Sequence, residues 1–179
     1  MLNRYAIEKE IERGSIYVDK VEGKICENFI NVTLGDSIKI YDSPFLDVRN
    51  SFATKEFPIP ESGFVIMPRE LYIAATFEFT KTYGFVPELC ESDELAALGM
   101  KSHITAGFGD NGFEGTWTLE IEASVPVRLY PNMIIGTLYY YPLIGNGDTL
   151  YRGKYFRQID PTASRLSEEY DMGRVRKTC

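Results

Sequence analysis

The clearest structural pattern in this chain is an alternation of apolar and polar residues that follows the tripeptide Asp110-Asn111-Gly112. The tripeptide lies between two extended runs, residues 102–108 and 113–123. In the second run Trp117, Leu119 and Ile121 alternate with Thr118, Glu120 and Glu122. A period of two is typical of a strand with one buried face. Asn-Gly between two such runs predicts a β-hairpin.

Short strands are expected over most of the remaining chain. They are predicted at residues 16–18, 31–35, 37–41, 125–130 and 134–142, and residues 63–80 predict two strands broken at Pro68-Arg69-Glu70. Residues 43–62 carry prolines and polar groups and predict a loop. Because helices do not alternate with these strands, the pattern favours a β-sandwich or a barrel-like jelly roll. The length of 179 residues fits one domain over residues 1–179.

Helices are expected at only a few places. Residues 3–13 predict an N-terminal helix that ends at Gly14. Ser92 is expected to cap a short internal helix that ends at Gly99. A further short helix is expected within residues 164–170. The fold class that follows is mainly β, with an N-terminal helix and one short internal helix.

Charge and composition exclude several classes of partner. The net charge of −7 leaves no counterion-release gain on a nucleic-acid backbone, so polymeric DNA or RNA is not expected as the ligand. The N-terminus is too charged for a signal peptide, and no apolar run approaches the roughly 20 residues of a membrane helix. Cys26, Cys90 and Cys179 are scattered, which suits a reducing compartment. We therefore expect a cytoplasmic protein.

Zinc chemistry is also not expected. Zinc-dependent nucleobase deaminases bind the metal through a His or Cys together with two further cysteines. This chain has one histidine, His103, and no Cys-x-x-Cys pair. Any hydrolytic chemistry on a base would then rely on carboxylates.

Several stretches resemble, in collinear order, the dCTP deaminase branch of the trimeric dUTPase-like fold. They are residues 3–16, 30–35, 95–100, 106–115, Leu119-Glu120, 151–158 and 161–165. The most specific are the Ala-Gly-x-x-Asp-x-Gly-Phe-x-Gly segment at 106–115 with its following Glu, and the Lys-x-x-x-Gln tail at 154–158. The resemblance implies a distorted jelly-roll β-barrel and a homotrimer whose pockets form between subunits.

The resemblance gives Glu120 the role of general base. Without zinc, a carboxylate must take the proton of the attacking water and hand it to the leaving amine. Alternation places Glu120 opposite the core-facing Leu119, where it can reach a pocket. Taken from alternation alone, Glu120 would be a solvated strand residue.

The segment around the Asn-Gly turn resembles the part of the family site that holds the nucleoside. Asp110 is similar to the carboxylate that contacts the deoxyribose 3′-hydroxyl, and Phe113 to the aromatic residue under the sugar. Main-chain groups at Gly107 and Phe108 would read the edge of the pyrimidine. Asp at a turn is also common for structural reasons alone.

The C-terminal tail and the internal helix resemble the phosphate-binding parts of the family site. Tyr151, Lys154 and Gln158 would hold the phosphates, Lys154 as a point charge and Gln158 as an amide donor. Ser92, at the helix start, is a further candidate phosphate contact. A basic solvated tail is the alternative interpretation of the same residues.

The helix motif departs from the family pattern. The family motif opens Gly-Arg-Ser-Ser with another Arg three residues later, whereas this chain has Glu91-Ser92-Asp93-Glu94 and then Ala97. Carboxylates here offset the attraction of a helix start for anions. If Asp93 and Glu94 point to solvent, the deaminase hypothesis holds; if they point into the pocket, its rivals gain.

Three functions therefore stay open. The first is a deaminase that converts dCTP and water to dUTP and ammonia, with Glu120 as base. The second is a non-catalytic or altered member of the fold that binds or sequesters nucleotides. The third is a Mg²⁺-dependent pyrophosphatase acting on dUTP or a modified nucleotide through Asp110. In each case Mg²⁺ is expected with the nucleotide phosphates and not at a fixed protein site.

Overall fold

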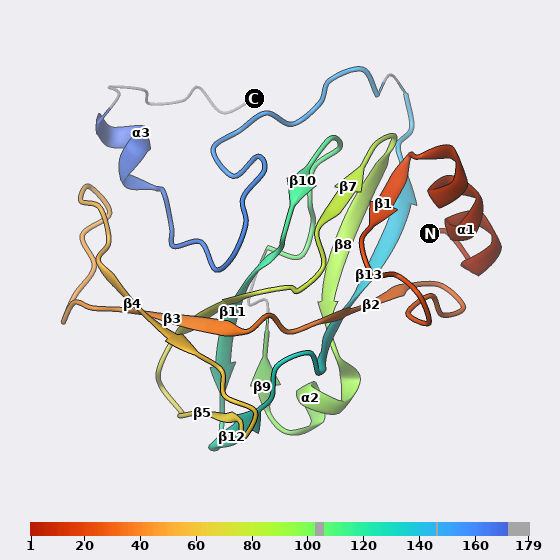
Figure 1. Ribbon diagram of the computed structural model, residues 1–179. Coiled ribbons are helices and arrows are strands. Elements are labelled where there is room, and N and C mark those ends of the chain that lie inside the picture. Colours follow the sequence, from red (N-terminus) through yellow and green to blue (C-terminus); the bar gives the residue numbers. More distant parts are fainter. Residues whose placement is uncertain (103–105, 146, 172–179) are drawn as a thin grey trace.

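The computed structural model describes residues 1–102, 106–145 and 147–171 (Figure 1). In chain order the elements are α1 (Arg4–Arg13), β1 (Ile16–Val18), β2 (Ile30–Thr33), β3 (Ser37–Tyr41), β4 (Thr54–Pro58), β5 (Phe64–Ile66), β6 (Tyr72–Ala75), β7 (Thr80–Thr82), β8 (Phe85–Glu91), α2 (Asp93–Ala97), β9 (Met100–Lys101), β10 (Glu114–Gly115), β11 (Thr118–Ala123), β12 (Val127–Leu129), β13 (Ile134–Pro142) and α3 (Ser167–Asp171). The mainly β class expected from the sequence is confirmed.

The strands of the described residues form four antiparallel sheets. The largest has the order β4-β3-β6-β11-β9, and two three-stranded sheets have the orders β1-β7-β10 and β2-β13-β8. The remaining pair is β12-β5. Most of the paired strands are distant in sequence, as in the pairing of β2 with β13. Long-range pairing of this kind is characteristic of sandwich-like β folds.

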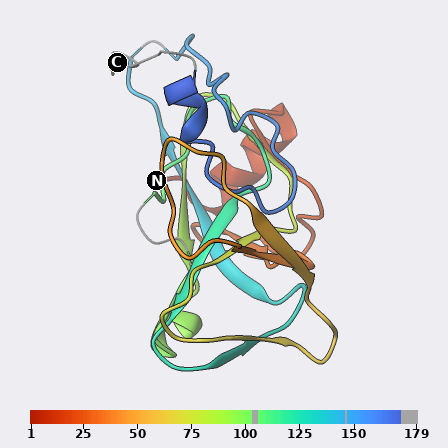
Figure 2. The ribbon, with the colours of Figure 1, turned by 90° about the vertical axis from the view of Figure 1, so that its left-hand side faces the viewer.

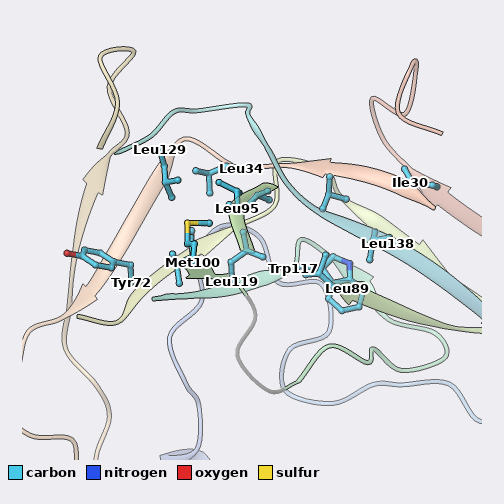
Figure 3. Packing of buried hydrophobic residues seen from close by; sticks show 14 of the residues in the cluster. Ile30, Leu34, Tyr72, Leu89, Leu95, Met100, Trp117, Leu119, Leu129 and Leu138 are labelled. Atoms are coloured by element: carbon cyan, nitrogen blue, oxygen red, sulfur yellow. The ribbon is translucent and has the colours of Figure 1, made fainter. Parts of the chain in front are cut away.

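The core lies between the sheets and is built from the inward faces of their strands (Figure 3). Leu119 and Ile121 of β11 are buried together with Leu34, Leu129 and Met100. The alternation that the sequence shows over residues 117–123 is therefore the burial pattern of β11. This strand positions one face in the core and the other toward a cavity.

Helix α1 has both of the caps that its sequence predicts. The Asn3 side chain accepts a hydrogen bond from the Ala6 amide at 3.0 Å. Gly14 adopts a left-handed conformation with φ of 77°, and its amide donates to the Ile11 carbonyl. Ile7 is the residue of the helix that packs fully into the core. The helix is thus an ordinary packing element over the β2-β13-β8 side (Figure 1).

The loop expected over residues 43–62 is wrong in its second half. Residues 54–58 form β4, which pairs in antiparallel register with β3 at the edge of the largest sheet. The strand is largely exposed, so its sequence lacks the alternation that marks a half-buried strand. Pro58 stands at its end, a position that an edge strand tolerates.

The turn at Asp110–Gly112 is present, and the chain on its two sides pairs antiparallel away from the turn, where β9 and β11 join Lys101 to Glu122. Beside the turn the expected hairpin is wrong. The segment before the turn pairs with β8, through a bridge between Glu88 and Phe108, whereas β10 after the turn pairs with β7. The positive φ falls on Gly112 (88°), while a two-residue hairpin of this kind requires it at both central residues. Residues 103–105 of the expected first strand, including His103, lie outside the described residues.

Asn111 explains the difference. Its side-chain oxygen accepts from the Gly84 amide at 2.8 Å, and its nitrogen donates to the carbonyls of Gly147 and Thr149. The residue is 9% exposed. Its side chain therefore ties the turn to the β7–β8 connection and to the C-terminal tail, and the turn serves tertiary packing.

A cavity at the end of β11

A cavity of about 400 Å³ lies between β11, the turn at 106–113 and the C-terminal tail. Its wall holds Asp110 and Glu120. The aromatic residues of the wall are Tyr41, Phe108, Phe113, Trp117, Tyr151 and Tyr155. The remaining lining residues are Leu71, Ile73, Ala106, Gly109, Thr118, Gln158, Thr162 and Ser164. The size and the aromatic wall suit a ligand of nucleoside dimensions.

Strand β11 supplies one of the two carboxylates of the cavity wall, that of Glu120. Because side chains alternate along a strand, Thr118 and Glu120 face the cavity while Leu119 is 1% exposed in the core. Glu120 is opposite Ile73 of β6, which lines the same cavity. The sequence-predicted orientation of Glu120 is confirmed in this respect. Thr118 was missed, although the same alternation places it on the Glu120 face.

The turn supplies Asp110, Phe113 and close backbone contacts. The Phe113 amide donates to the Asp110 carbonyl at 3.1 Å, which closes the turn. A side chain at Gly109 would come within 2.5 Å of the Trp117 ring, so glycine lets the main chain pass directly over that ring. Gly107 is not among the lining residues; its carbonyl accepts from the Leu89 amide of β8.

Stacked aromatic rings shape the cavity wall. The ring centroids of Phe113 and Trp117 are 5.4 Å apart, and those of Phe113 and Tyr151 are 6.2 Å apart. The Trp117 indole donates to the Thr80 hydroxyl at 3.1 Å, so the ring is held in place. Phe108 is different, because it is 68% exposed and contacts the ring of Tyr141. The rings of Phe113, Trp117 and Tyr151 offer a flat apolar surface that fits under a sugar or a base.

The C-terminal tail covers the cavity by pairing with residues next to β10. Gly115 and Gln158 form a parallel bridge, and the Thr116 amide donates to the Gln158 carbonyl at 3.1 Å. In Figure 1 this blue segment runs beside β10. The tail therefore brings Tyr151, Tyr155 and Gln158 to the cavity from a distant part of the sequence.

A buried carboxylate anchors the tail. Glu114 is 4% exposed and accepts hydrogen bonds from the Tyr83 hydroxyl at 2.5 Å and from Arg157 Nε at 2.9 Å. The hydrogen bond from Tyr83, together with Arg157, outweighs burial and lowers the pKa of the Glu114 carboxyl below its ordinary value. The sequence analysis did not identify Glu114, because the family segment at 106–115 specifies no residue type at this position.

Gln158 is held through one end of its amide. Nε2 donates to the Thr116 carbonyl at 2.9 Å and to the Thr118 hydroxyl at 3.2 Å. Oε1 is buried and has no hydrogen-bond partner among the described residues. The donor that the sequence assigns to phosphate is thus used within the protein.

Lys154 lies outside the lining of the cavity, and its expected phosphate contact stays a prediction. Its ammonium forms an ion pair with Glu169 of α3 at 2.5 Å, and its side chain is 19% exposed. Arg165 donates to the Lys154 carbonyl and so fixes the same stretch. A nearby carboxylate supplied by α3 therefore holds the ammonium away from the cavity in this conformation.

Ser92 is also not brought to the cavity. It is 5% exposed at the start of α2, makes no side-chain cap bond and donates instead to the Glu94 carboxylate at 2.8 Å. Asp93 and Glu94 are exposed, and neither lines the cavity. Figures 1 and 2 place α2 and the C-terminal tail at opposite ends of the molecule.

The two leucines of the internal helix differ in burial. Leu95 is buried at 4% exposure, but Leu98 is 54% exposed. The helix has a single turn and Leu98 already belongs to its C-cap, so the side chain points away from the core. This end of α2 presents an apolar side chain beside its acidic first turn.

The electrostatic character of the cavity is acidic. Its described lining has the two carboxylates and neither a lysine nor an arginine. Over the described ranges, no cluster of three or more His, Cys, Asp or Glu side chains suited to a metal ion is found. The helices within those ranges are too short or too polar to cross a bilayer.

Known proteins resemble this chain over most of its length. A family model described as dCTP deaminase-like matches residues 1–143. The "dCTP deaminase, dUMP-forming" of Clostridium beijerinckii is 41% identical over 134 residues, which cover 75% of this chain and 78% of that protein. A protein of the same name from Clostridium botulinum is 39% identical over 155 residues, covering 87% of this chain and 90% of the relative.

A solved structure shares the fold. The 2′-deoxycytidine 5′-triphosphate deaminase of Agrobacterium tumefaciens superposes with a TM-score of 0.62 at 13% identity, over 78% of this chain. This chain spans 47% of the length of that protein. The family resemblance that the sequence suggested is confirmed by the family model and by the curated relatives. This chain belongs to the dCTP deaminase-like family.

Proposed function

We propose that this chain is a zinc-independent deaminase of deoxycytidine nucleotides, with dCTP as substrate and Glu120 as the general base. The observation that carries the proposal is the position of Glu120 in the wall of an aromatic cavity, together with Asp110 and Phe113. The relatives at about 40% identity bear the name of this activity, which supports the same reaction here.

The reaction needs one group that both takes and gives a proton. Water adds to C4 of the cytosine ring while its proton passes to the Glu120 carboxylate. The resulting tetrahedral carbon bears both a hydroxyl and the amine. Glu120 returns the proton to the amine, the C4–N bond breaks and ammonia leaves. The hydroxyl proton moves to N3 as C4 becomes a carbonyl. The sum is cytosine plus water to uracil plus ammonia.

Loss of pyrophosphate is a second candidate activity of the same cavity. The curated relatives are named dUMP-forming, and Asp110 lies in the wall where it can orient a water molecule. In this proposal Mg²⁺ enters with the phosphates and neutralises their charge beside an acidic lining. The product is then dUMP in place of dUTP.

We further propose that the active form is a homotrimer in the cytoplasm, where deoxynucleotides are found. Ser92 and the start of α2 are distant from the cavity of their own chain, so a neighbouring subunit would complete the phosphate end of the site. Light scattering at micromolar concentration should give three chains. A monomer that is fully active would overturn this part of the proposal.

The direct test is a nucleotide panel. Melting temperatures are measured with dCTP, dUTP, dTTP and the monophosphates, with and without Mg²⁺. Ammonia release and product identity are then followed for the nucleotides that stabilise the protein. We expect ammonia from dCTP. Stabilisation by nucleotides without ammonia would favour a binding protein, and release of pyrophosphate from dUTP alone would favour the pyrophosphatase.

A further inference from the structure

We propose that Glu169 of α3 competes with the phosphates of the nucleotide for the ammonium of Lys154, so that a phosphorylated ligand binds by displacing α3. Lys154 is the phosphate contact that the sequence predicts, and Glu169 is the residue that holds its ammonium in the structure. The inference rests on the proposed function, because it takes the ligand to be a nucleotide with a phosphate chain.

The ion pair between α3 and the tail is close and partly open to solvent. Lys154 Nζ lies 2.5 Å from Glu169 Oε1, and the two side chains are 19% and 33% exposed. The two residues are 15 positions apart, so the pair is a tertiary contact that ties α3 to the tail. A phosphate oxygen is the same kind of charged acceptor for an ammonium as a carboxylate oxygen. An anionic ligand can therefore replace Glu169 without a change in the type of bond.

The ammonium lies beside a ring of the cavity wall. Lys154 Nζ is 5.4 Å from the centroid of the Tyr155 ring, and Tyr155 lines the cavity. The Arg165 amide donates to the Tyr155 hydroxyl at 3.0 Å, and the Arg165 guanidinium donates to the Lys154 carbonyl. These bonds hold the main chain of Lys154 next to Tyr155, while the flexible four-carbon stem lets the ammonium turn.

A phosphate chain in this cavity meets charges of its own sign. The lining, as far as the structure describes it, holds Asp110 and Glu120 and neither lysine nor arginine. Because like charges repel, a nucleotide gains from a cation that comes from just outside the lining. Lys154 is next in sequence to the lining residue Tyr155 and supplies such a cation.

Lys154 differs from the arginines of the tail in what binds it. Arg157 is paired with the buried Glu114, which anchors the tail itself. Arg152 donates to two main-chain carbonyls. Arg165 is bound to the carbonyl of Lys154 and lies 3.8 Å from a glutamate three positions away. The Lys154 ammonium is instead bound to a side chain of α3, so movement of that helix makes it available.

Helix α3 is short and can give way to a ligand. It has five residues, and Glu168 and Tyr170 among them are exposed. In Figure 1 the helix lies at the periphery of the molecule, beyond the tail segment. A helix of this length is marginal without tertiary support, and a partly exposed ion pair contributes little to stability. A phosphate chain, which carries more charge than one carboxylate, can therefore displace Glu169.

The exchange sets how strongly the phosphates contribute to binding. The apparent affinity of a ligand that needs Lys154 is its intrinsic affinity multiplied by the fraction of molecules in which Lys154 is released from Glu169. A nucleoside, which has no phosphate, is unaffected. When the phosphate chain leaves the site, Glu169 recovers Lys154, and this favours release of a product that has lost pyrophosphate.

The test is a double-mutant cycle at the ion pair, with binding measured by calorimetry. The ligands are the α,β-imido analogue of dCTP and deoxycytidine, titrated in an E120Q background so that neither is converted. E169Q removes the competing charge and keeps the shape of the side chain, so the dCTP analogue should bind roughly twofold to fivefold more tightly. Deoxycytidine should bind as before. K154M should weaken binding of the dCTP analogue, and E169Q added to K154M should give no gain.

E168Q is the matched control. It removes the same charge from the neighbouring position of α3, where the carboxylate faces Arg165, and should leave the affinity for the dCTP analogue close to the native value. An equal gain in E168Q, or a gain from E169Q that persists in K154M, would show a general charge effect and overturn the inference. Unchanged binding in E169Q, or weaker binding of both ligands, would overturn it as well.

Inorganic tripolyphosphate separates this inference from the proposed function. Its binding at Lys154 does not depend on the deaminase reaction, so E169Q should also bind it more tightly than the native protein does. Ammonia release from dCTP by the native protein, with no gain in E169Q, would contradict the exchange alone. A gain for tripolyphosphate without ammonia release from dCTP would contradict the deaminase and leave the exchange in place.

Discussion

Arg157 Nε lies 2.9 Å from the Glu114 carboxylate, and this ion pair joins the C-terminal tail to the strand that precedes β11. The main chain repeats the connection, because the Arg157 amide donates to the Glu114 carbonyl at 2.7 Å. Arg157 adopts a left-handed φ of 60° at this point. The buried Glu114 carboxylate therefore holds the tail at Arg157, next to the cavity residue Gln158.

Acid should release the tail. The pKa of Glu114 is lowered in the folded protein by Tyr83 and Arg157, so its contribution to stability is full above the unfolded pKa of about 4.3 and is lost as pH falls through the folded value. Trp117, the single tryptophan, lies in the cavity wall under the tail and reports the change by fluorescence. We expect a reversible transition below about pH 4 that is absent in E114Q. An identical transition in E114Q would rule out Glu114 as the group responsible.

Asp110→Asn should weaken the binding of dCTP. The carboxylate is the charged acceptor proposed for the 3′-hydroxyl, and an amide accepts a hydrogen bond less strongly. The expected effect is a rise in KM for dCTP of roughly tenfold, with a smaller change for 2′,3′-dideoxy-CTP, which lacks that hydroxyl. The measurement is KM for both nucleotides with the native protein and with the variant. Equal KM values for the two nucleotides in the native protein would remove this role for Asp110.

Neutralising the start of α2 should tighten triphosphate binding. Asp93, Glu94 and Ala97 are exposed, so D93S/E94S/A97R does not disturb the core. It removes two negative charges, which repel the triphosphate, and adds one positive charge, which attracts it. Ser92 is left in place because it is buried. The affinity for dCTP should rise severalfold at low salt and less at high salt, since exposed charges are screened.

The matched control for α2 changes exposed acids elsewhere. E12R/E22S changes the net charge by the same amount at exposed sites on α1 and in the segment after β1. If both sets of substitutions change the dCTP affinity equally, only net charge matters. If neither changes it, the acids of α2 face away from every phosphate in the assembled protein.

The sequence predicted what depends on local patterns. The two faces of β11 followed from strict alternation, and both ends of α1 followed from Asn3 and Gly14. Glu120 and Asp110 were placed in the same cavity as expected. These features are local because strand periodicity and helix capping are set by residues within a few positions of one another.

The sequence does not predict contacts between distant segments. Glu169 of α3 binds the Lys154 ammonium, while the phosphate role of Lys154 stays a prediction. The Asn111 side chain bonds to Gly84 and to the tail, so the chain beside the turn departs from the expected hairpin. The sequence did not predict β4, because an exposed edge strand shows no alternation of apolar and polar residues. None of these partners can be read from spacing along the chain.

The measurement that tests the central claim most directly is ammonia release from dCTP by the native protein, by E120Q and by E122Q. Glu122 lies two positions further along β11, is exposed and does not line the cavity, so E122Q makes the same chemical change outside the site. E120Q should fold normally and lose about 10²-fold or more of the rate, because an amide cannot accept the proton of the attacking water. E122Q should retain the native rate. Full activity in E120Q would contradict the account and remove Glu120 from the chemistry.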